Sequence, residues 1–167
     1  MVKVTDSITK VCCFYASDWH FVTMLLPHVN KSINEGNKIT TILEKDSQNK
    51  VKTLLEKLKL KNEKKILEID WTKKEINSDE VEKILRKRGE KPIEIIISGN
   101  LEYIDNANDI IEQYIYNNQV KRKIKIIDCY YIEEENLNVK EILNKHDMVI
   151  NTAGEKNVDS YVCKIKN

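Results

Sequence analysis

Glycine and proline are scarce in this chain. Only 4 glycines and 2 prolines occur among 167 residues, and no stretch rich in Gly, Pro or Ser divides the sequence. We therefore expect a single domain over residues 1–167. Neither sign of charge dominates, because 28 Lys and Arg stand against 27 Asp and Glu. This balance gives no overall attraction to nucleic acid or to an anionic membrane surface, and we expect neither partner.

Long apolar runs are also missing. The first residues, 1–6, lack the apolar core of a signal peptide, and no run approaches the ~20 apolar residues of a membrane span. We therefore expect a cytoplasmic protein with its 4 cysteines reduced. The CxxC or HxxxH-like spacing of metal sites is absent, so we expect no metal.

Two of the cysteines, Cys12 and Cys13, are adjacent in an apolar, strand-like run. Neighbouring side chains on a strand point to opposite faces, which makes a bridge between the two unfavourable. The simplest interpretation is that both are small apolar core residues. The alternatives are a redox-sensing thiol and a metal ligand acting with His20.

What the chain does have is a regular alternation of strand-like and helical patterns. Strands are predicted at 11–15, 38–43, 65–70, 93–98, 124–131 and 148–152, with a weaker edge strand at 159–165. Helices are predicted at 21–35, 49–58, 78–89, 105–117 and 138–146. Alternation of this kind, with near-continuous apolar strands, predicts an α/β three-layer sandwich. Its sheet would be mainly parallel, with six or seven strands, and RecA/Rossmann-like.

The turn after the first strand has the wrong chemistry for an ATPase. A phosphate-binding loop needs glycines, so that backbone amides approach the phosphates, and a lysine to meet their charge. The segment Tyr15–His20 offers neither, and instead holds an acid, an indole and an imidazole. The sequence therefore predicts the frame of a nucleotide-binding domain without its phosphate loop, and no cofactor.

Ligands of parallel sheets bind where the strands end. On that basis the predicted ligand-binding residues are Tyr15, Asp18, Trp19, His20, Asp70, Trp71, Ser98, Asn100 and Tyr130. A wall formed by Tyr15, Trp19 and His20 suits a small, partly apolar ligand better than a triphosphate. The alternative is a helix-capping turn whose indole packs over the edge of the sheet.

Several segments together resemble the MEDS domain, a sensory domain of methanogens and methylotrophs named with the DcmR regulator. The matching segments are 11–15, 25–27 and 33–39 near the start, and 126–130 and 142–150 near the end. The resemblance implies a degenerate RecA/KaiC-like fold that has lost the phosphate loop and senses a ligand.

The chain departs from the family pattern at four positions. Lys10 stands where the family usually has His, and Asp128 where it often has Cys. Tyr131 replaces an Asp, and Asp147 replaces a Pro. The departures leave the identity of the ligand open.

We therefore expect a non-catalytic sensory or regulatory module. It would bind a small, partly apolar ligand at the strand ends and signal through a protein partner, since the sequence carries no output domain; homo-oligomerisation is left open. One alternative is an enzyme that uses the same cleft, either a divergent nucleotide hydrolase or a catalyst built from Cys12, His20 and Asp18. Another is an interaction protein that uses only its helical faces.

The missing phosphate loop generates a first prediction. Isothermal titration calorimetry with ATP and Mg²⁺ should give no heat of binding at hundreds of micromolar nucleotide, because no glycine-rich cradle follows Tyr15. A phosphate-loop ATPase measured under the same conditions is the positive control. A dissociation constant in the low micromolar range would contradict the prediction.

Overall fold

A computed structural model describes residues 8–86 and 91–159, which form six strands and six helices. The strands are β1 (Ile8–Tyr15), β2 (Lys38–Leu43), β3 (Ile93–Ser98), β4 (Ile124–Tyr131), β5 (Met148–Asn151) and β6 (Gly154–Asn157). They form one sheet in the order β2-β3-β4-β1-β5-β6. Every neighbouring pair is parallel except β5 with β6, which is antiparallel. The mainly parallel sheet is the one that the sequence predicts.

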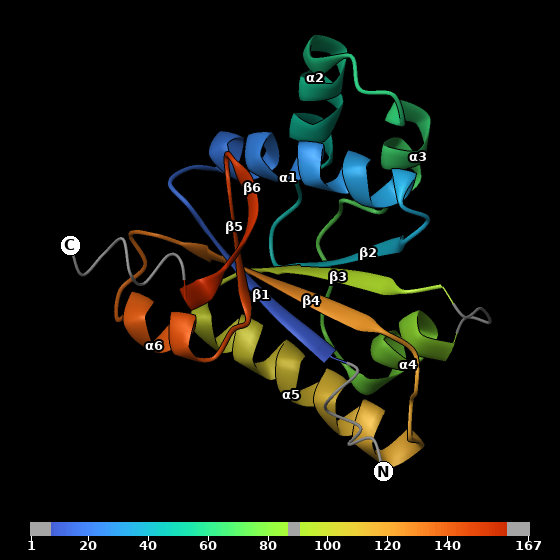
Figure 1. The fold of residues 1–167 in the computed structure, drawn as a ribbon, viewed down its shortest axis with the longest axis vertical. Coiled ribbons are helices and arrows are strands. Elements are labelled where there is room, and N and C mark those ends of the chain that lie inside the picture. Colours follow the sequence, from blue (N-terminus) through green and yellow to red (C-terminus); the bar gives the residue numbers. More distant parts are fainter. Residues whose placement is uncertain (1–7, 87–90, 160–167) are drawn as a thin grey trace.

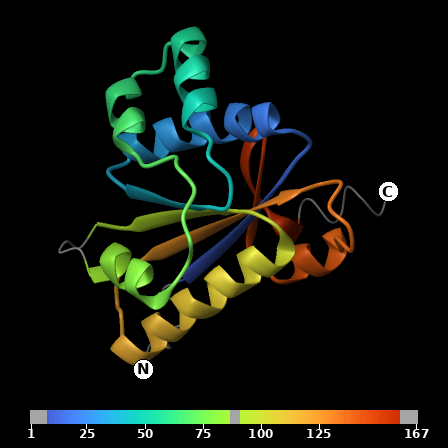
Figure 2. The same cartoon turned by 180° about the vertical axis from the view of Figure 1, so that it is seen from behind.

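Helices cover both faces of this sheet. They are α1 (Asp18–Asn34), α2 (Gln48–Leu58), α3 (Glu63–Glu68), α4 (Ser78–Arg86), α5 (Leu101–Asn118) and α6 (Val139–Asn144). Figure 1 shows α1, α2 and α3 on one side of the sheet and α4, α5 and α6 on the other. The view from behind in Figure 2 shows the same two layers. The protein is therefore an α/β three-layer, Rossmann-like sandwich, as predicted.

Strand β3 illustrates why the sheet needs a layer of helices on each face. All six of its residues, Ile93–Ser98, are buried, so both faces of this strand lie against helices. A strand with one solvated face would alternate apolar and polar residues instead. Helix α1 has the boundary residues that the sequence indicates, since Ser17 caps its start and Gly36, at a φ of 84°, follows its end. Helix α5 begins four residues before the predicted start at 105.

The adjacent cysteines divide between the two layers of the core. Cys12 packs in the cluster beneath α4, α5 and α6, and Cys13 packs in the cluster beneath α1, α2 and α3. Both are fully buried and unbridged, as is Cys129. Burial raises the pKa of the Cys12 thiol to about 12. These are the surroundings of structural cysteines.

The predicted strand at 65–70 is wrong, because this segment contains helix α3. As a strand it would present Ile66, Glu68 and Asp70 on one face, so neither of its faces is uniformly apolar. In the helix Ile66 is buried, whereas Leu67 is exposed. The carbonyl of Ile66 accepts a hydrogen bond from the indole of Trp71 at 2.9 Å, which closes the turn after the helix.

The sixth strand, β6, was not predicted. Its residues, Gly154–Asn157, carry no apolar side chain, and it forms as the return half of a two-residue hairpin with β5. Asn151 Oδ1 accepts a hydrogen bond from the amide of Ala153 at 2.8 Å in that turn. The predicted edge strand at 159–165 lies outside the described residues from position 160 onward, as does Cys163. Within residues 8–86 and 91–159, no helix is both long and apolar enough to span a membrane.

The burial of the cysteines leads to a second prediction. In a Cys163→Ser variant, which removes the one cysteine of undescribed position, a thiol reagent such as DTNB should label native protein slowly. Labelling of all three remaining thiols should become fast after denaturation, because only an exposed thiolate is nucleophilic. Fast labelling of Cys12 or Cys13 in the native protein would support the redox-sensor alternative.

Candidate functional site

A cavity of about 560 Å³ lies at the carboxyl ends of four neighbouring strands, β1, β2, β3 and β4. We call it the cleft. Its lining residues are Tyr15, Ala16, Ser17, Asp18, Phe21, Leu43, Glu44, Lys45, Ser47, Ser98, Gly99, Asn100, Tyr131 and Glu134. This is the edge at which parallel α/β sheets bind their ligands, and the volume is in the range of small-molecule sites.

Aromatic rings form one wall of the cleft. The ring of Tyr15 lies 5.1 Å from that of Phe21 and 5.8 Å from that of Tyr131, measured between centroids. The hydroxyl of Ser98 donates a weak hydrogen bond to Tyr15 Oη at 3.4 Å. Burial raises the pKa of Tyr15 to about 12, so its hydroxyl is neutral at ordinary pH. The wall is therefore apolar and uncharged.

The start of helix α5 forms another part of the cleft lining. Asn100 caps this helix, because its side-chain oxygen accepts from the amide of Tyr103 at 2.7 Å. Glu44, from the end of β2, accepts from the amide of Asn100 at 3.1 Å. Glu134, from the loop after β4, accepts from the amide of Leu101 at 2.8 Å. Two carboxylates from different loops thus meet the positive end of one helix.

A glycine makes this meeting sterically possible. A Cβ added to Gly99 would lie 2.5 Å from the ring of Tyr103 and 2.9 Å from Cβ of Glu44. Any other residue at this position would push the carboxylate and the ring apart. Tyr103 is held in place by a hydrogen bond from its hydroxyl to the carbonyl of Lys74 at 2.6 Å.

Four of the predicted site residues line the cleft: Tyr15, Asp18, Ser98 and Asn100. The others lie elsewhere. Tyr130 is buried on the α5/α6 face, where its ring stacks with Phe14, because successive residues of β4 point to opposite faces. Its neighbour Tyr131 occupies the cleft instead.

Asp70 and Trp71 were predicted as strand-end residues, but no strand precedes them. Asp70 follows α3 in a loop beside β2, and its carbonyl accepts a hydrogen bond from the hydroxyl of Thr41. Trp71 is buried in the core among the residues packed beneath α1, α2 and α3. The error in the strand assignment accounts for both residues.

Trp19 and His20 belong to the first turn of α1 but do not line the cleft. The indole is 47% exposed, and the ammonium of Lys50 lies 5.8 Å from its ring centroid. His20 Nδ1 accepts a hydrogen bond from the amide of Ala16 at 2.8 Å, and its own amide donates to Ser17 Oγ at 3.1 Å. This geometry is that of the helix-capping turn, the alternative interpretation.

The sequence-based site omitted the acidic side of the cleft. Glu44 follows β2 directly, so its place at a strand end was the signal that could have found it. Glu134 comes three residues after β4, in the acidic run Glu133–Glu135. Its position depends on the path of a loop, which no spacing rule predicts.

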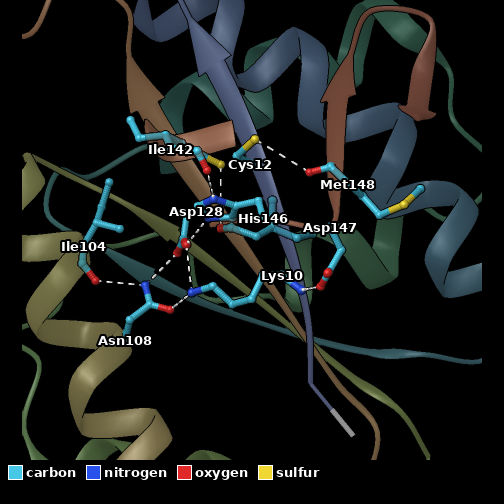
Figure 3. A network of polar contacts seen from close by, with 11 residues as sticks. Lys10, Cys12, Ile104, Asn108, Asp128, Ile142, His146, Asp147 and Met148 are labelled. Atoms are coloured by element: carbon cyan, nitrogen blue, oxygen red, sulfur yellow. Dashed lines mark hydrogen bonds and ion pairs between the residues drawn. The ribbon is translucent and has the colours of Figure 1, made fainter. Parts of the chain in front are cut away.

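A second polar cluster is buried between the sheet and the helices α5 and α6 (Figure 3). We call it the Asp128 network. The carboxylate of Asp128 is 1% exposed and lies 2.8 Å from His146 Nε2 and 3.1 Å from Lys10 Nζ. It also accepts from the side-chain amide of Asn108 at 2.8 Å. Lys10 contacts the side-chain oxygen of Asn108 as well.

In this network, charge pairing affects the pKa of Asp128 more strongly than burial does. Burial alone would raise the pKa of Asp128, but the hydrogen bond from His146 and the charge of Lys10 hold it below its ordinary value. His146 Nδ1 lies 2.6 Å from the carbonyl of Ile142, so both ring nitrogens face oxygen acceptors.

A similar pair is buried beneath α1. Glu94, 2% exposed on β3, lies 3.0 Å from His28 Nε2. Lys125 Nζ is 3.7 Å from the same carboxylate and 3.0 Å from Glu155. Burial would raise the pKa of Glu94, but the hydrogen bond and charge of His28 lower it below its ordinary value.

These buried networks do not assemble the suggested Cys/His catalyst. Cys12 lies on the α5/α6 face, where its thiol points to the carbonyl of Met148 at 3.6 Å. Asp18 and His20 lie at the start of α1, beyond the end of β1. Among the residues that the structure describes, no group of three or more His, Cys, Asp and Glu side chains is placed to hold a metal ion.

Comparison of the chain with protein-family models and with curated proteins gives no match. The likeness to the MEDS domain therefore stays a prediction.

The Asp128 network yields a third prediction, on stability. Because the pKa of Asp128 is lowered by folding, its stabilising contribution is fully present above the unfolded value near 4 and is lost as pH falls through the lower, folded value. Asp128→Asn should cost about 3–5 kcal/mol at neutral pH, because it removes the buried carboxylate that pairs with Lys10 and His146. Urea unfolding at several pH values measures this effect.

The wild type should lose stability more steeply than the variant between about pH 5 and pH 2. Glu94 adds to the acid loss in both proteins. The matched control is Asp109→Asn on the exposed side of α5, next to Asn108 in sequence, which should change the free energy of unfolding little. Equal pH slopes for wild type and Asp128→Asn would show that Asp128 is not charged in the folded protein.

Proposed function

We propose that the protein is a non-catalytic sensory or regulatory module that binds a small, partly apolar ligand in the cleft. The observation that carries the proposal is the cavity itself. It has about 560 Å³ at the carboxyl ends of four strands, with Tyr15, Phe21 and Tyr131 on one wall. Ring-lined cavities with a few placed polar groups are typical small-molecule sites.

The polar groups around the cleft do not favour a nucleotide as ligand, because the backbone amides that would bind its phosphates already have partners. At the start of α5, the amides of Asn100 and Leu101 are already occupied by carboxylates of the chain. At the start of α1, the amides of Ala16 and His20 are occupied by side chains of the same turn. A nucleotide would have to displace these contacts to use either helix end.

The effect of a bound ligand would be passed to the surface of the protein by the loop after β4. The amide of Ile132 donates to the carbonyl of Tyr15 at 2.9 Å, which ties this loop to the end of β1. The same loop carries Glu134 and leads into α6. A ligand that contacts Tyr131 would therefore act on a segment exposed at Ile132, where a protein partner could detect the change.

The fourth prediction tests ligand binding in the cleft with two matched aromatic variants. A set of single-ring organic fragments, neutral and charged, is titrated into ¹⁵N-labelled protein. Binding members should shift the amide signals of Ala16, Gly99 and Tyr131. Tyr131→Ala should weaken their binding about threefold to tenfold, the usual value of an aromatic contact.

Trp19→Ala is the control, because Trp19 is also an exposed aromatic residue but lies outside the cleft. It should leave affinity unchanged. Shifts scattered over the surface, or equal losses in both variants, would contradict the cleft as the binding site. Hydrogen exchange at residues 132–144 should change with a bound fragment, and mass spectrometry should recover the fragment chemically unaltered. A converted fragment would support the enzyme alternative.

A further inference from the structure

We propose that the ligand of the cleft is a small organic cation, an ammonium group on an apolar body about the size of one ring. The inference rests on the proposed function, since it names the chemical class for the same site. It comes from the charges of the lining, from the contacts already made by the helix ends, and from the aromatic wall.

The lining carries three carboxylates, Asp18, Glu44 and Glu134, against one ammonium, Lys45. Asp18 has a partner outside the lining, Lys50, at 3.8 Å, in a pair whose side chains are 33% and 58% exposed for the lysine and the aspartate. Pairs of this kind neutralise little. Over the described residues, Glu44 and Glu134 form no ion pair within 4.0 Å. The cleft therefore holds an excess of negative charge.

Each of these two glutamates commits one oxygen to an amide of α5. The second oxygen of Glu134 is buried and has no hydrogen-bond partner. A buried carboxylate oxygen without a donor is costly, and native proteins rarely leave one so. A cation in the cleft would be attracted by the charge of this carboxylate even without direct contact. A modest movement of the Glu134 side chain would bring its second oxygen into contact with the cation.

Anions are disfavoured by the same contacts. A helix start attracts anions through its free amides and its dipole. Here the amides of Asn100, Leu101 and Tyr103 already donate to oxygens of the chain, two of them to carboxylates. The protein thus supplies its own anions at the start of α5, where a ligand anion would otherwise find free amides.

The aromatic wall suits the apolar part of such a cation and also its charge. Tyr15 and Tyr131 lie 5.8 Å apart with their rings inclined at 39°, and Phe21 lies beside Tyr15. Ring faces attract ammonium groups, and the attraction grows as the site is desolvated. Carboxylates and aromatic rings that line one cavity form a site for an ammonium compound. They would repel its carboxylate analogue.

Three compounds of nearly equal size test the inference: 2-phenylethylamine, 2-phenylethanol and 3-phenylpropanoate, which are cationic, neutral and anionic at neutral pH. We expect the amine to bind most tightly by calorimetry, the alcohol more weakly and the acid not at all. Binding of the amine should weaken with added salt. Glu44→Gln/Glu134→Gln should lower the affinity for the amine by about tenfold or more and leave that for the alcohol unchanged.

The substitutions to glutamine keep an oxygen that accepts from the amides of Asn100 and Leu101, so the start of α5 is preserved while the charge is lost. Thermal melting confirms that each variant is folded, and Glu44→Gln alone provides the test if the double variant is not. Glu112→Gln, which removes an exposed carboxylate from α5 outside the cleft, is the control and should not alter amine binding.

The outcomes separate the two proposals. If the alcohol binds as tightly as the amine, or the glutamine variants bind the amine unchanged, the carboxylates serve only as helix caps. The cation inference is then overturned, while ligand binding in the cleft stands. Preference for the acid, or no binding of any of the three, also overturns it. Ligand binding in the cleft is overturned by different results, namely those of the fragment titration given above.

Discussion

The start of helix α5 is the point on which the cleft depends. Two carboxylates from the loops after β2 and β4, those of Glu44 and Glu134, accept hydrogen bonds from the amides of Asn100 and Leu101 at this helix start. These contacts join three strand ends that are adjacent in the sheet but distant in sequence. They also place carboxylates of the chain at the positive end of the helix, and the lining as a whole has three carboxylates against one ammonium. Gly99 permits the arrangement by leaving room for Glu44 and Tyr103.

Buried charge on the α5/α6 face places a second constraint on the sheet. Asp128 is enclosed in the middle of β4 and is stable there only because Lys10, Asn108 and His146 all contact it. Three of the four departures from the MEDS pattern meet here. Lys10 pairs with Asp128 by its side chain, and its backbone amide donates to the carboxylate of Asp147 at 3.0 Å. The three residues thus depend on one another through direct contacts, because Lys10 contacts both carboxylates.

Much of this architecture could be predicted from the sequence, and the exceptions have physical causes. The parallel strands were recognisable because β1, β3 and β4 are nearly continuous apolar runs that only a doubly covered sheet can bury. The segment 65–70 misled because Ile66 and Leu67 belong to a short helix in which only Ile66 is buried, and Ile69 packs against the core after the end of that helix. Strand β6 has no apolar signal, since pairing in a hairpin, rather than burial, forms it.

The site was less predictable than the fold for a reason of geometry. Position at a strand end correctly placed Tyr15, Ser98 and Asn100, because the end of a parallel strand is fixed by the sheet. The choice between Tyr130 and Tyr131 required the orientation of β4, and an error of one residue moves a side chain to the opposite face. Glu134 required the path of a loop. Sequence patterns thus locate the edge of a sheet where a ligand binds, but they do not determine the sign of the charge that lines it.

That sign links the missing phosphate loop to the chemistry of the present cleft. A frame of this kind that binds phosphates keeps its helix ends free, because the amides are the binding groups. In the turn after β1, which has neither glycine nor lysine, the amides of Ala16 and His20 donate to His20 Nδ1 and Ser17 Oγ instead. At the start of α5 the acceptors are carboxylates, which match both the amides and the helix dipole. The cleft thus has capped helix ends where a phosphate site would have free amides, and two of the caps at α5 are acidic.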